Sequence, residues 1–188
     1  MKIGVLALQG AFIEHRKKLT ELGADSFEIR NKFDLSESMD GLILPGGEST
    51  VMGKLLYDLD MLDDLKSKIK DGLPVFGTCA GLILLAKKIE GSQESFLNVM
   101  DITVKRNAYG RQLGSFFAEA QFTDIGNIPM TFIRAPYISE LSDSVTVLSE
   151  VGGNIVAASE KNMLGTSYHP ELTSSNQVHK YFLDNFCY

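Results

Sequence analysis

Residues 73–81 read LPVFGTCAG and run directly into the apolar segment LILLA at residues 82–86. The first segment has the short, β-branched and aromatic character of a buried strand, and the second is typical of a buried helix. Cys79 stands at the junction, with Gly77 two residues before it and Gly81 two residues after it. This pattern predicts a sharp strand-to-helix turn that presents one side chain as a nucleophile.

The predicted turn places Cys79 in a strained backbone conformation at the N-terminus of a helix. The two glycines leave room for the returning chain, and the helix dipole and free N–H groups favour a thiolate over a thiol. An isolated cysteine is more often a small buried side chain that fills a gap beside a helix. The glycine context favours the nucleophile instead, but a nucleophilic cysteine also needs a base.

The first half of the chain has the pattern of a parallel sheet. Strands are predicted at residues 2–8, 26–29 and 41–44, and the run at 2–8 is apolar without polar alternation, as expected for a strand covered on both faces. Between the first two, residues 11–22 have the period of an amphipathic helix with Lys18 on its outer side. Strand, helix and strand in this order form a βαβ unit.

A glycine-rich loop, PGGEST, occupies residues 45–50 directly after the strand at 41–44. Adjacent glycines there let backbone N–H groups point at an anion, and Ser49 or Thr50 is expected to cap the next helix. An ordinary strand-to-helix turn also fits this motif. The strand before Cys79 ends at the same edge of the sheet, where open α/β sheets bind ligands, and this favours a functional loop.

The second half of the chain predicts mixed strand pairing. Short alternating segments occur at residues 102–104, 115–120 and 130–133, and a hairpin is expected between residues 145–148 and 155–158. The expected fold class is therefore α/β with three layers: a mostly parallel central sheet flanked by helices, with a nucleophile elbow and a mixed or antiparallel extension. The chain of 188 residues is 44% apolar, and we expect one domain over residues 1–188.

The motif His169-Pro170-Glu171 follows the last predicted strand, at residues 163–168. Pro170 fixes its own φ and favours extended geometry in the preceding residue, so His169 is held at the strand end. Glu171 then falls on the same side, where its carboxylate can orient the imidazole. With Cys79, these side chains predict a nucleophile, a base and an orienting carboxylate.

The other histidines and the second cysteine suggest no chemistry. His15 and His179 lie on otherwise polar predicted helix faces, and we interpret them as structural or exposed. Cys187 lies beside the C-terminus, and a disulfide with Cys79 is not expected in an intracellular chain. The cysteine spacing fits no zinc site, so we expect no metal.

Composition argues against two classes of partner. The formal net charge is −6, and Lys and Arg form no stripe that would neutralise phosphates, so we expect no nucleic-acid partner. No apolar run approaches the roughly 20 residues that span a bilayer, and the chain begins with a strand rather than a signal peptide. We therefore expect a soluble, cytoplasmic protein with no membrane partner.

Several motifs resemble those of the class I, or triad, glutamine amidotransferases. The elbow at residues 77–81, the PGGES loop at 45–49 and the His-Pro-Glu motif at 169–171 carry this resemblance. Other segments are similar to one branch of the family, the glutaminase subunits of two-component pyridoxal 5′-phosphate synthases. These are ALQG at 7–10, LILPGGEST at 42–50, RNAYGRQ at 106–112, FIRAP at 132–136 and HPELT at 169–173.

The resemblance implies hydrolysis of glutamine without a cofactor. Cys79 would attack the side-chain amide, ammonia would leave, and water would release glutamate from a thioester. His169 would act as general base and then acid, and Glu171 would fix its tautomer. The oxyanion would meet the backbone N–H groups of Gly47 and Ala80. The implied glutamine contacts are Gly46, Gly47, Glu48, Arg106, Ile133 and Arg134.

The resemblance also implies a partner. Ammonia would pass to a separate synthase subunit, within a large hetero-oligomer, that builds pyridoxal 5′-phosphate from a pentose phosphate and a triose phosphate. The chain departs from the pattern of this branch at Asn98, Gly114 and residues 174–176. These departures concern outer loops and partner docking, because none of them touches the proposed triad.

Three other functions remain open from the sequence. A glutaminase serving another synthase, such as imidazole glycerol phosphate synthase, would keep the triad but should lack the RNAYGRQ segment. A hydrolase or peptidase with a cysteine elbow would differ in whether glutamine alone is turned over. A non-catalytic regulatory domain would bind a partner and would have no use for Cys79, His169 and Glu171 together.

Overall fold

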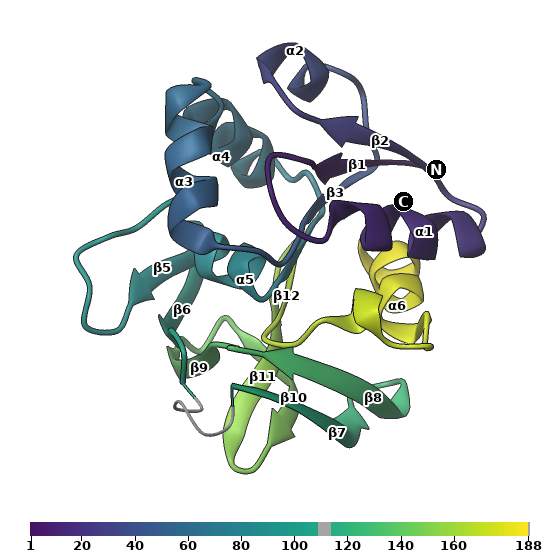
Figure 1. Ribbon diagram of the computed structural model, residues 1–188, viewed down its shortest axis with the longest axis vertical. Helices are drawn as coiled ribbons and strands as arrows, with labels where there is room; N and C mark the ends of the chain where they lie inside the picture. The colour runs from purple at the N-terminus through teal and green to yellow at the C-terminus, as the bar shows by residue number, and fades with distance from the viewer. Residues whose placement is uncertain (109–113, 188) are drawn as a thin grey trace.

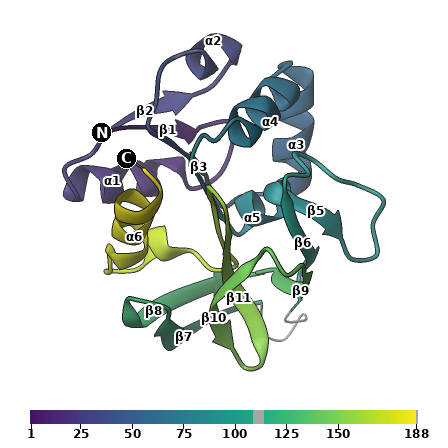
Figure 2. The same ribbon diagram turned by 180° about the vertical axis from the view of Figure 1, so that it is seen from behind.

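The computed structural model describes residues 1–108 and 114–187, which form three layers around a large twisted sheet (Figure 1). The described part of this sheet has ten strands, nine of them in the order β2-β1-β3-β4-β12-β11-β9-β6-β5, with β10 paired to β11. The view from behind shows helices on both sides of the sheet (Figure 2). The α/β fold class predicted from the sequence is confirmed.

The parallel half of the sheet contains the strands that lead to the candidate site. Every neighbouring pair in the order β2-β1-β3-β4-β12 is parallel. All residues of β3, β4 and β12 are buried, which explains their continuous apolar sequences. The bounds are β1 (Lys2–Leu6), β2 (Asp25–Ile29), β3 (Gly41–Leu44), β4 (Val75–Thr78) and β12 (Met163–Thr166).

The other half of the sheet is mixed, as predicted. The pairs of β11 with β12, β9 and β10, and of β6 with β9, are antiparallel, whereas β5 and β6 are parallel. The hairpin prediction is confirmed by β10 and β11. The sequence analysis did not identify β5 or β9. The bounds are β5 (Ala86–Ile89), β6 (Met100–Lys105), β9 (Tyr137–Leu141), β10 (Thr146–Val151) and β11 (Asn154–Glu160).

The strands β7 (Ser115–Phe122) and β8 (Gly126–Ile133) form a separate antiparallel ribbon. The ribbon packs on the same face of the large sheet as α1 (Phe12–Glu21) and α6 (Gln177–Phe186). Residues from α1, α6, β7 and β8 join one apolar cluster with residues of the central strands. This face therefore combines a helical layer with a β-ribbon.

The opposite face is covered by α3 (Ser49–Asp58), α4 (Leu62–Lys70) and α5 (Ala80–Leu85), whose apolar side chains form a second cluster. A short helix, α2 (Lys32–Leu35), follows β2 and was not predicted. Within the described residues, no helix has both the length and the apolar character that crossing a bilayer requires.

Two local predictions are wrong. Glu48, rather than Ser49 or Thr50, caps α3: its carboxylate accepts hydrogen bonds from the N–H groups of Thr50 and Val51, both at 3.2 Å. Lys18 is buried instead of outside, because α1 packs against the short 3-10 helix η2 (Pro170–Leu172). Its ammonium donates a hydrogen bond of 2.7 Å to the carbonyl of Thr173.

Close backbone approach fixes the elbow between β4 and α5. A Cβ atom on Gly81 would lie 2.0 Å from the carbonyl oxygen of Leu44, at the end of β3. A Cβ atom on Gly77 would lie 2.7 Å from the carbonyl carbon and oxygen of Gly81. Both contacts involve backbone atoms, so a side chain at either position requires the strand or the helix to move.

We predict that Gly81→Ala lowers the free energy of unfolding by about 1–3 kcal/mol, the usual cost of overpacking a close contact. Alanine gains about 1 kcal/mol over glycine in a helix, but the 2.0 Å contact with Leu44 outweighs this gain. The matched control is Gly114→Ala, because a Cβ atom there meets nothing within 4 Å. Urea unfolding of both variants measures the difference, and equal stabilities would contradict the prediction.

Candidate active site

Cys79 occupies the sharp turn that the sequence predicts. β4 ends at Thr78 and α5 begins at Ala80, so Cys79 alone makes the turn, with φ 49° and ψ −98°. Such a conformation costs of order 1–3 kcal/mol for a residue with a side chain. The backbone N–H of Cys79 donates a hydrogen bond of 2.8 Å to the carbonyl of Thr166 in β12. The bond ties the elbow to the strand that precedes the His-Pro-Glu motif.

His169 and Glu171 form a buried pair beside the elbow. Nδ1 of His169 lies 2.7 Å from Oε1 of Glu171, the arrangement expected from their spacing. The backbone N–H of His169 donates a 2.8 Å hydrogen bond to the carbonyl of Thr131 in β8. The imidazole is therefore positioned through its own backbone and through a carboxylate.

The surroundings of His169 favour its protonated form. Burial disfavours the positive charge, but interactions with Cys79 and with the carboxylate of Glu171 outweigh it and raise the pKa of His169 to about 10. His169 therefore carries a proton at neutral pH. A cationic imidazole beside Cys79 stabilises negative charge on the sulfur.

A pocket of about 530 Å³ opens over Cys79 and His169. Its size suits a small polar molecule. Glu171 is buried behind His169, and Ala80 begins α5 directly after the elbow. The pocket lining brings together every substrate contact expected from the sequence: Gly46, Gly47, Glu48, Arg106, Ile133 and Arg134.

Arg106 reaches the pocket from the loop after β6. Its Nη1 donates a 3.4 Å hydrogen bond to Oγ1 of Thr50, and its Nη2 lies 3.1 Å from Oε2 of Glu94. These contacts hold the guanidinium at the pocket while leaving it part-exposed. Residues 109–112 of the RNAYGRQ segment lie outside the described residues.

The glycine loop is held by the segment that follows β1. The carbonyl of Gly46 accepts a 3.0 Å hydrogen bond from the N–H of Ala11, and the N–H of Glu48 donates 2.8 Å to Oε1 of Gln9. A Cβ atom on Gly46 would lie 2.2 Å from Cε1 of His169, so only glycine lets the loop pack against this imidazole. Gln9 also lines the pocket, and sequence analysis did not select it as a site residue. The available signal was its place at the carboxyl end of a central strand.

His15 and His179 are fully buried, which corrects the interpretation of their helix faces as polar. Nδ1 of His15 lies 2.9 Å from Nε2 of His179, and Nε2 of His15 lies 3.1 Å from Oγ1 of Thr78. Each histidine precedes a buried leucine by four residues, Leu19 in α1 and Leu183 in α6. Helical periodicity was therefore the signal that could have placed them on the inner faces.

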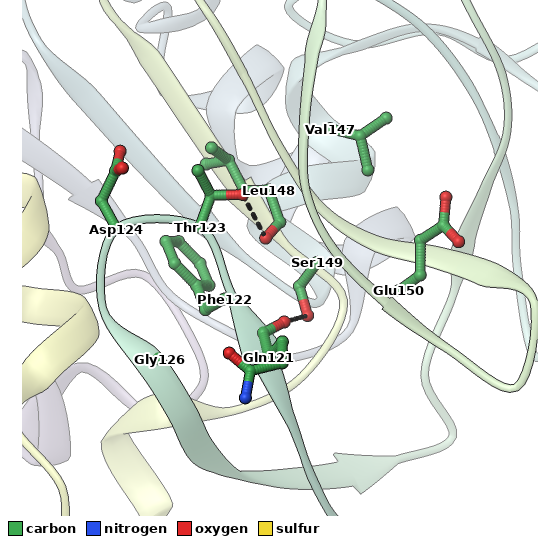
Figure 3. Close-up of a pocket in the computed structure, with 9 residues that line it drawn as sticks. All are labelled: Gln121, Phe122, Thr123, Asp124, Gly126, Val147, Leu148, Ser149 and Glu150. Atoms are coloured by element: carbon green, nitrogen blue, oxygen red, sulfur yellow. Dashed lines mark hydrogen bonds between the residues drawn. The ribbon is translucent and has the colours of Figure 1, made fainter.

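A second hollow, of about 390 Å³, lies beside the β7–β8 ribbon and β10 (Figure 3). The hydroxyl groups of Thr123 and Ser149 point to backbone carbonyls, of Leu148 at 3.2 Å and of Gln121 at 2.6 Å. The nine residues drawn there include no cysteine or histidine. This hollow therefore lacks the combination of a cysteine and a histidine that lines the pocket at Cys79.

The arrangement at Cys79 suits attack by sulfur on a small amide or ester, followed by proton transfer through His169. The fold and site define a class of α/β proteins in which a cysteine stands at a strand-to-helix turn beside a buried His–Glu pair. The chain belongs to the SNO glutamine amidotransferase family, whose model matches residues 5–188.

Similarity to individual proteins supports this family assignment. The chain is 59% identical to pyridoxal 5′-phosphate synthase subunit PdxT of Streptococcus pneumoniae (strain CGSP14), over 98% of this chain and 96% of the relative. It is 58% identical to the protein of the same name from Haemophilus influenzae (strain PittEE), over 98% and 97%. A crystal structure described as a glutamine amidotransferase superposes with a TM-score of 0.92 at 42% identity, covering 97% of both chains.

The raised pKa of His169 predicts a pH-dependent contribution to stability. The folded pKa of about 10 exceeds the unfolded value near 6.5, so this contribution is full below about pH 6.5 and is lost as pH rises through about 10. We expect the difference in unfolding free energy between the wild type and His169→Asn to shrink between pH 7 and pH 10. Urea titrations at several pH values measure it.

Burial lowers the pKa of His15 and of His179, so both side chains are already neutral in the folded protein from pH 7 to pH 10 and add little to this change. A difference that stays constant from pH 7 to pH 10 would contradict the assigned protonation of His169.

Proposed function

We propose that this chain is the glutaminase subunit of a pyridoxal 5′-phosphate synthase. It hydrolyses L-glutamine to L-glutamate and ammonia and delivers the ammonia to a separate synthase subunit. The observation that carries this proposal is 58–59% identity to PdxT proteins over nearly the full length of both chains. The pocket over Cys79 and His169 supplies a site for the reaction.

In the proposed mechanism, the sulfur of Cys79 attacks the side-chain carbonyl carbon of glutamine. The tetrahedral oxyanion meets the backbone N–H groups of Gly47 and Ala80. As the C–N bond breaks, His169 gives its proton to the departing amine, and ammonia and a thioester form. His169 then accepts a proton from water, which attacks the thioester and releases glutamate.

Glu171 keeps the imidazole in the tautomer that presents Nε2 to Cys79, because its Oε1 is bound to Nδ1. Its negative charge also stabilises the imidazolium. Glu171 is an orienting group, since it is buried behind His169 and does not line the pocket.

The remaining pocket residues bind the amino-acid part of glutamine. Arg106 supplies a guanidinium for the α-carboxylate, a group far from the scissile amide. Gly46, Gly47, Glu48, Ile133 and Arg134 complete the pocket around the substrate.

Residues 1–188 act as one glutaminase domain in this proposal, and the synthase subunit is a different chain in a large hetero-oligomer. The PdxT relatives are matched over 96–97% of their length, which leaves little of them for a second activity. The same similarity favours this branch over a glutaminase of imidazole glycerol phosphate synthase. The assembled Cys79, His169 and Glu171 argue against a purely regulatory domain.

The direct test of the proposed function is glutamate release from glutamine in the presence of a pyridoxal 5′-phosphate synthase subunit. We predict that Cys79→Ala lowers this release by at least about 10³-fold, because the covalent step is lost. The matched control is Cys187→Ala, a second buried cysteine that packs near Gly41 at the start of β3 and should remain active.

Near-normal release by Cys79→Ala would reject the mechanism. A folded wild-type protein that releases no glutamate with the synthase subunit would reject the function itself.

We predict that Arg106→Ala raises KM for glutamine about tenfold or more and changes kcat little. A charge-assisted hydrogen bond to a carboxylate contributes about 1.5–3 kcal/mol, and this contact is present both before and during the reaction. The control is Lys105→Ala, because Lys105 pairs with Glu90 at 3.0 Å and does not line the pocket. An unchanged KM in Arg106→Ala would assign the residue to docking or to loop structure.

A further inference from the structure

A buried polar cluster lies behind the His169–Glu171 pair. His15 comes from α1 and His179 from α6, and neither has any exposed surface. Nε2 of His15 lies 3.1 Å from Oγ1 of Thr78 and 3.5 Å from Oε2 of Glu171. On its other side, Nδ1 of His15 lies 2.9 Å from Nε2 of His179. A line of polar groups thus runs from α6 through α1 to the carboxylate of Glu171.

Both histidines of this cluster are neutral at physiological pH. Burial, followed by the charges of His179 and His169, lowers the pKa of His15 well below its usual value. Burial, followed by the charge of Lys18, lowers the pKa of His179 to about 3. Each ring therefore carries one N–H and one lone pair.

The contacts select one tautomer for each ring. A lone pair on Nε2 of His15 would face the negatively charged Oε2 of Glu171, so Nε2 carries the hydrogen. Nδ1 of His15 then accepts a hydrogen bond from the Nε2–H of His179. The remaining Nδ1 of His179 has no partner in the described part of the chain. It bears a lone pair, which avoids a buried N–H without an acceptor.

We propose that His15 is a positioning residue for glutamine hydrolysis, whose Nε2–H edge faces the carboxylate oxygen Oε2 of Glu171 at 3.5 Å and attracts it electrostatically, while His179 fixes the tautomer of His15. This inference rests on the proposed function. Oε1 of Glu171 is hydrogen-bonded to His169. Among the described residues, Oε2 has no hydrogen-bond partner. The N–H of His15 at 3.5 Å therefore faces the free end of the carboxylate.

The hydrogen bond of this N–H goes to the elbow. Thr78, whose hydroxyl group lies 3.1 Å from Nε2 of His15, is the last residue of β4 and directly precedes Cys79. One imidazole therefore contacts both the residue before the nucleophile and the carboxylate behind the base. Because His15 is neutral, it does not compete with His169 for the negative charge of Glu171.

A positioning role predicts a particular pattern in kinetics. His15 does not line the glutamine pocket, so its loss should lower kcat and leave KM nearly unchanged. The variant His15→Phe keeps an aromatic ring next to Phe76, which His15 meets edge to face at 6.1 Å between centroids. We expect His15→Phe to lower kcat about tenfold or more in the assay with the synthase subunit.

The rescue variant is His15→Gln, which places an amide N–H near the position of Nε2. We expect it to retain clearly more of kcat than His15→Phe, and His179→Gln to show a smaller loss of the same kind. Urea unfolding confirms that each variant is folded under assay conditions. If His15→Phe does not fold, His15→Gln and His179→Gln carry the test.

The decisive measurement is a double-mutant cycle with Glu171→Gln. If His15 acts through Glu171, His15→Phe costs a much smaller factor in the Glu171→Gln background than in the wild type. A merely structural role predicts the same factor in both backgrounds. Equal factors, a loss confined to KM, or no advantage of His15→Gln over His15→Phe would overturn the proposal.

A second readout separates this proposal from the proposed function. The rate at which iodoacetamide alkylates Cys79, measured by mass spectrometry in a Cys187→Ala background, needs neither glutamine nor a partner. We expect His15→Phe to slow this alkylation several-fold, since a displaced His169 no longer stabilises the thiolate. If the wild type releases no glutamate yet His15→Phe slows alkylation, the function fails and the positioning role stands. An unchanged alkylation rate overturns the positioning role.

Discussion

The candidate site depends on one constraint: the chain must leave β4 and enter α5 within a single residue. This constraint gives Cys79 its φ of 49° and brings Gly81 so close to Leu44 that no side chain fits. A conformation of this kind persists only where its surroundings determine it. The hydrogen bond from Cys79 to Thr166 and the burial of all α5 side chains provide that support. The backbone of three strands and the buried helix α5 therefore hold Cys79 in this conformation.

Burial alone would make all the histidines near this site neutral, and the interactions with Cys79 and with the carboxylate of Glu171 make His169 the charged one. His169 lies 2.7 Å from this carboxylate and beside Cys79, so its pKa is raised despite burial. His15 lies 3.5 Å from the other carboxylate oxygen and next to a second histidine, and its pKa is lowered. The charged imidazole of His169 and the neutral imidazole of His15 thus differ in their distance from this carboxylate and in their other neighbours.

The parts of the site that the sequence predicted are those set by short-range geometry. Cys79 between two glycines and Glu171 two residues after His169 both follow from local backbone rules, and the structure places them as expected. His15 and Gln9 were not assigned to the site because their partners lie far along the chain, at residues 179 and 48. Charged residues next to His15 and His179 in the sequence suggested polar helix faces, yet both histidines and even Lys18 are buried in the structure. Such contacts depend on how helices dock, which local patterns do not encode.

The position of β12 determines when the parts of the site can come together during synthesis on the ribosome. β12 is the final strand in the chain, yet it lies between β4 and β11 and joins the two halves of the sheet. Cys79 is synthesised before α5, whereas His169 and Glu171 follow β12. In a growing chain, the proposed nucleophile therefore lacks its proposed base and carboxylate until residues 169–171 have been synthesised and β12 has paired with β4.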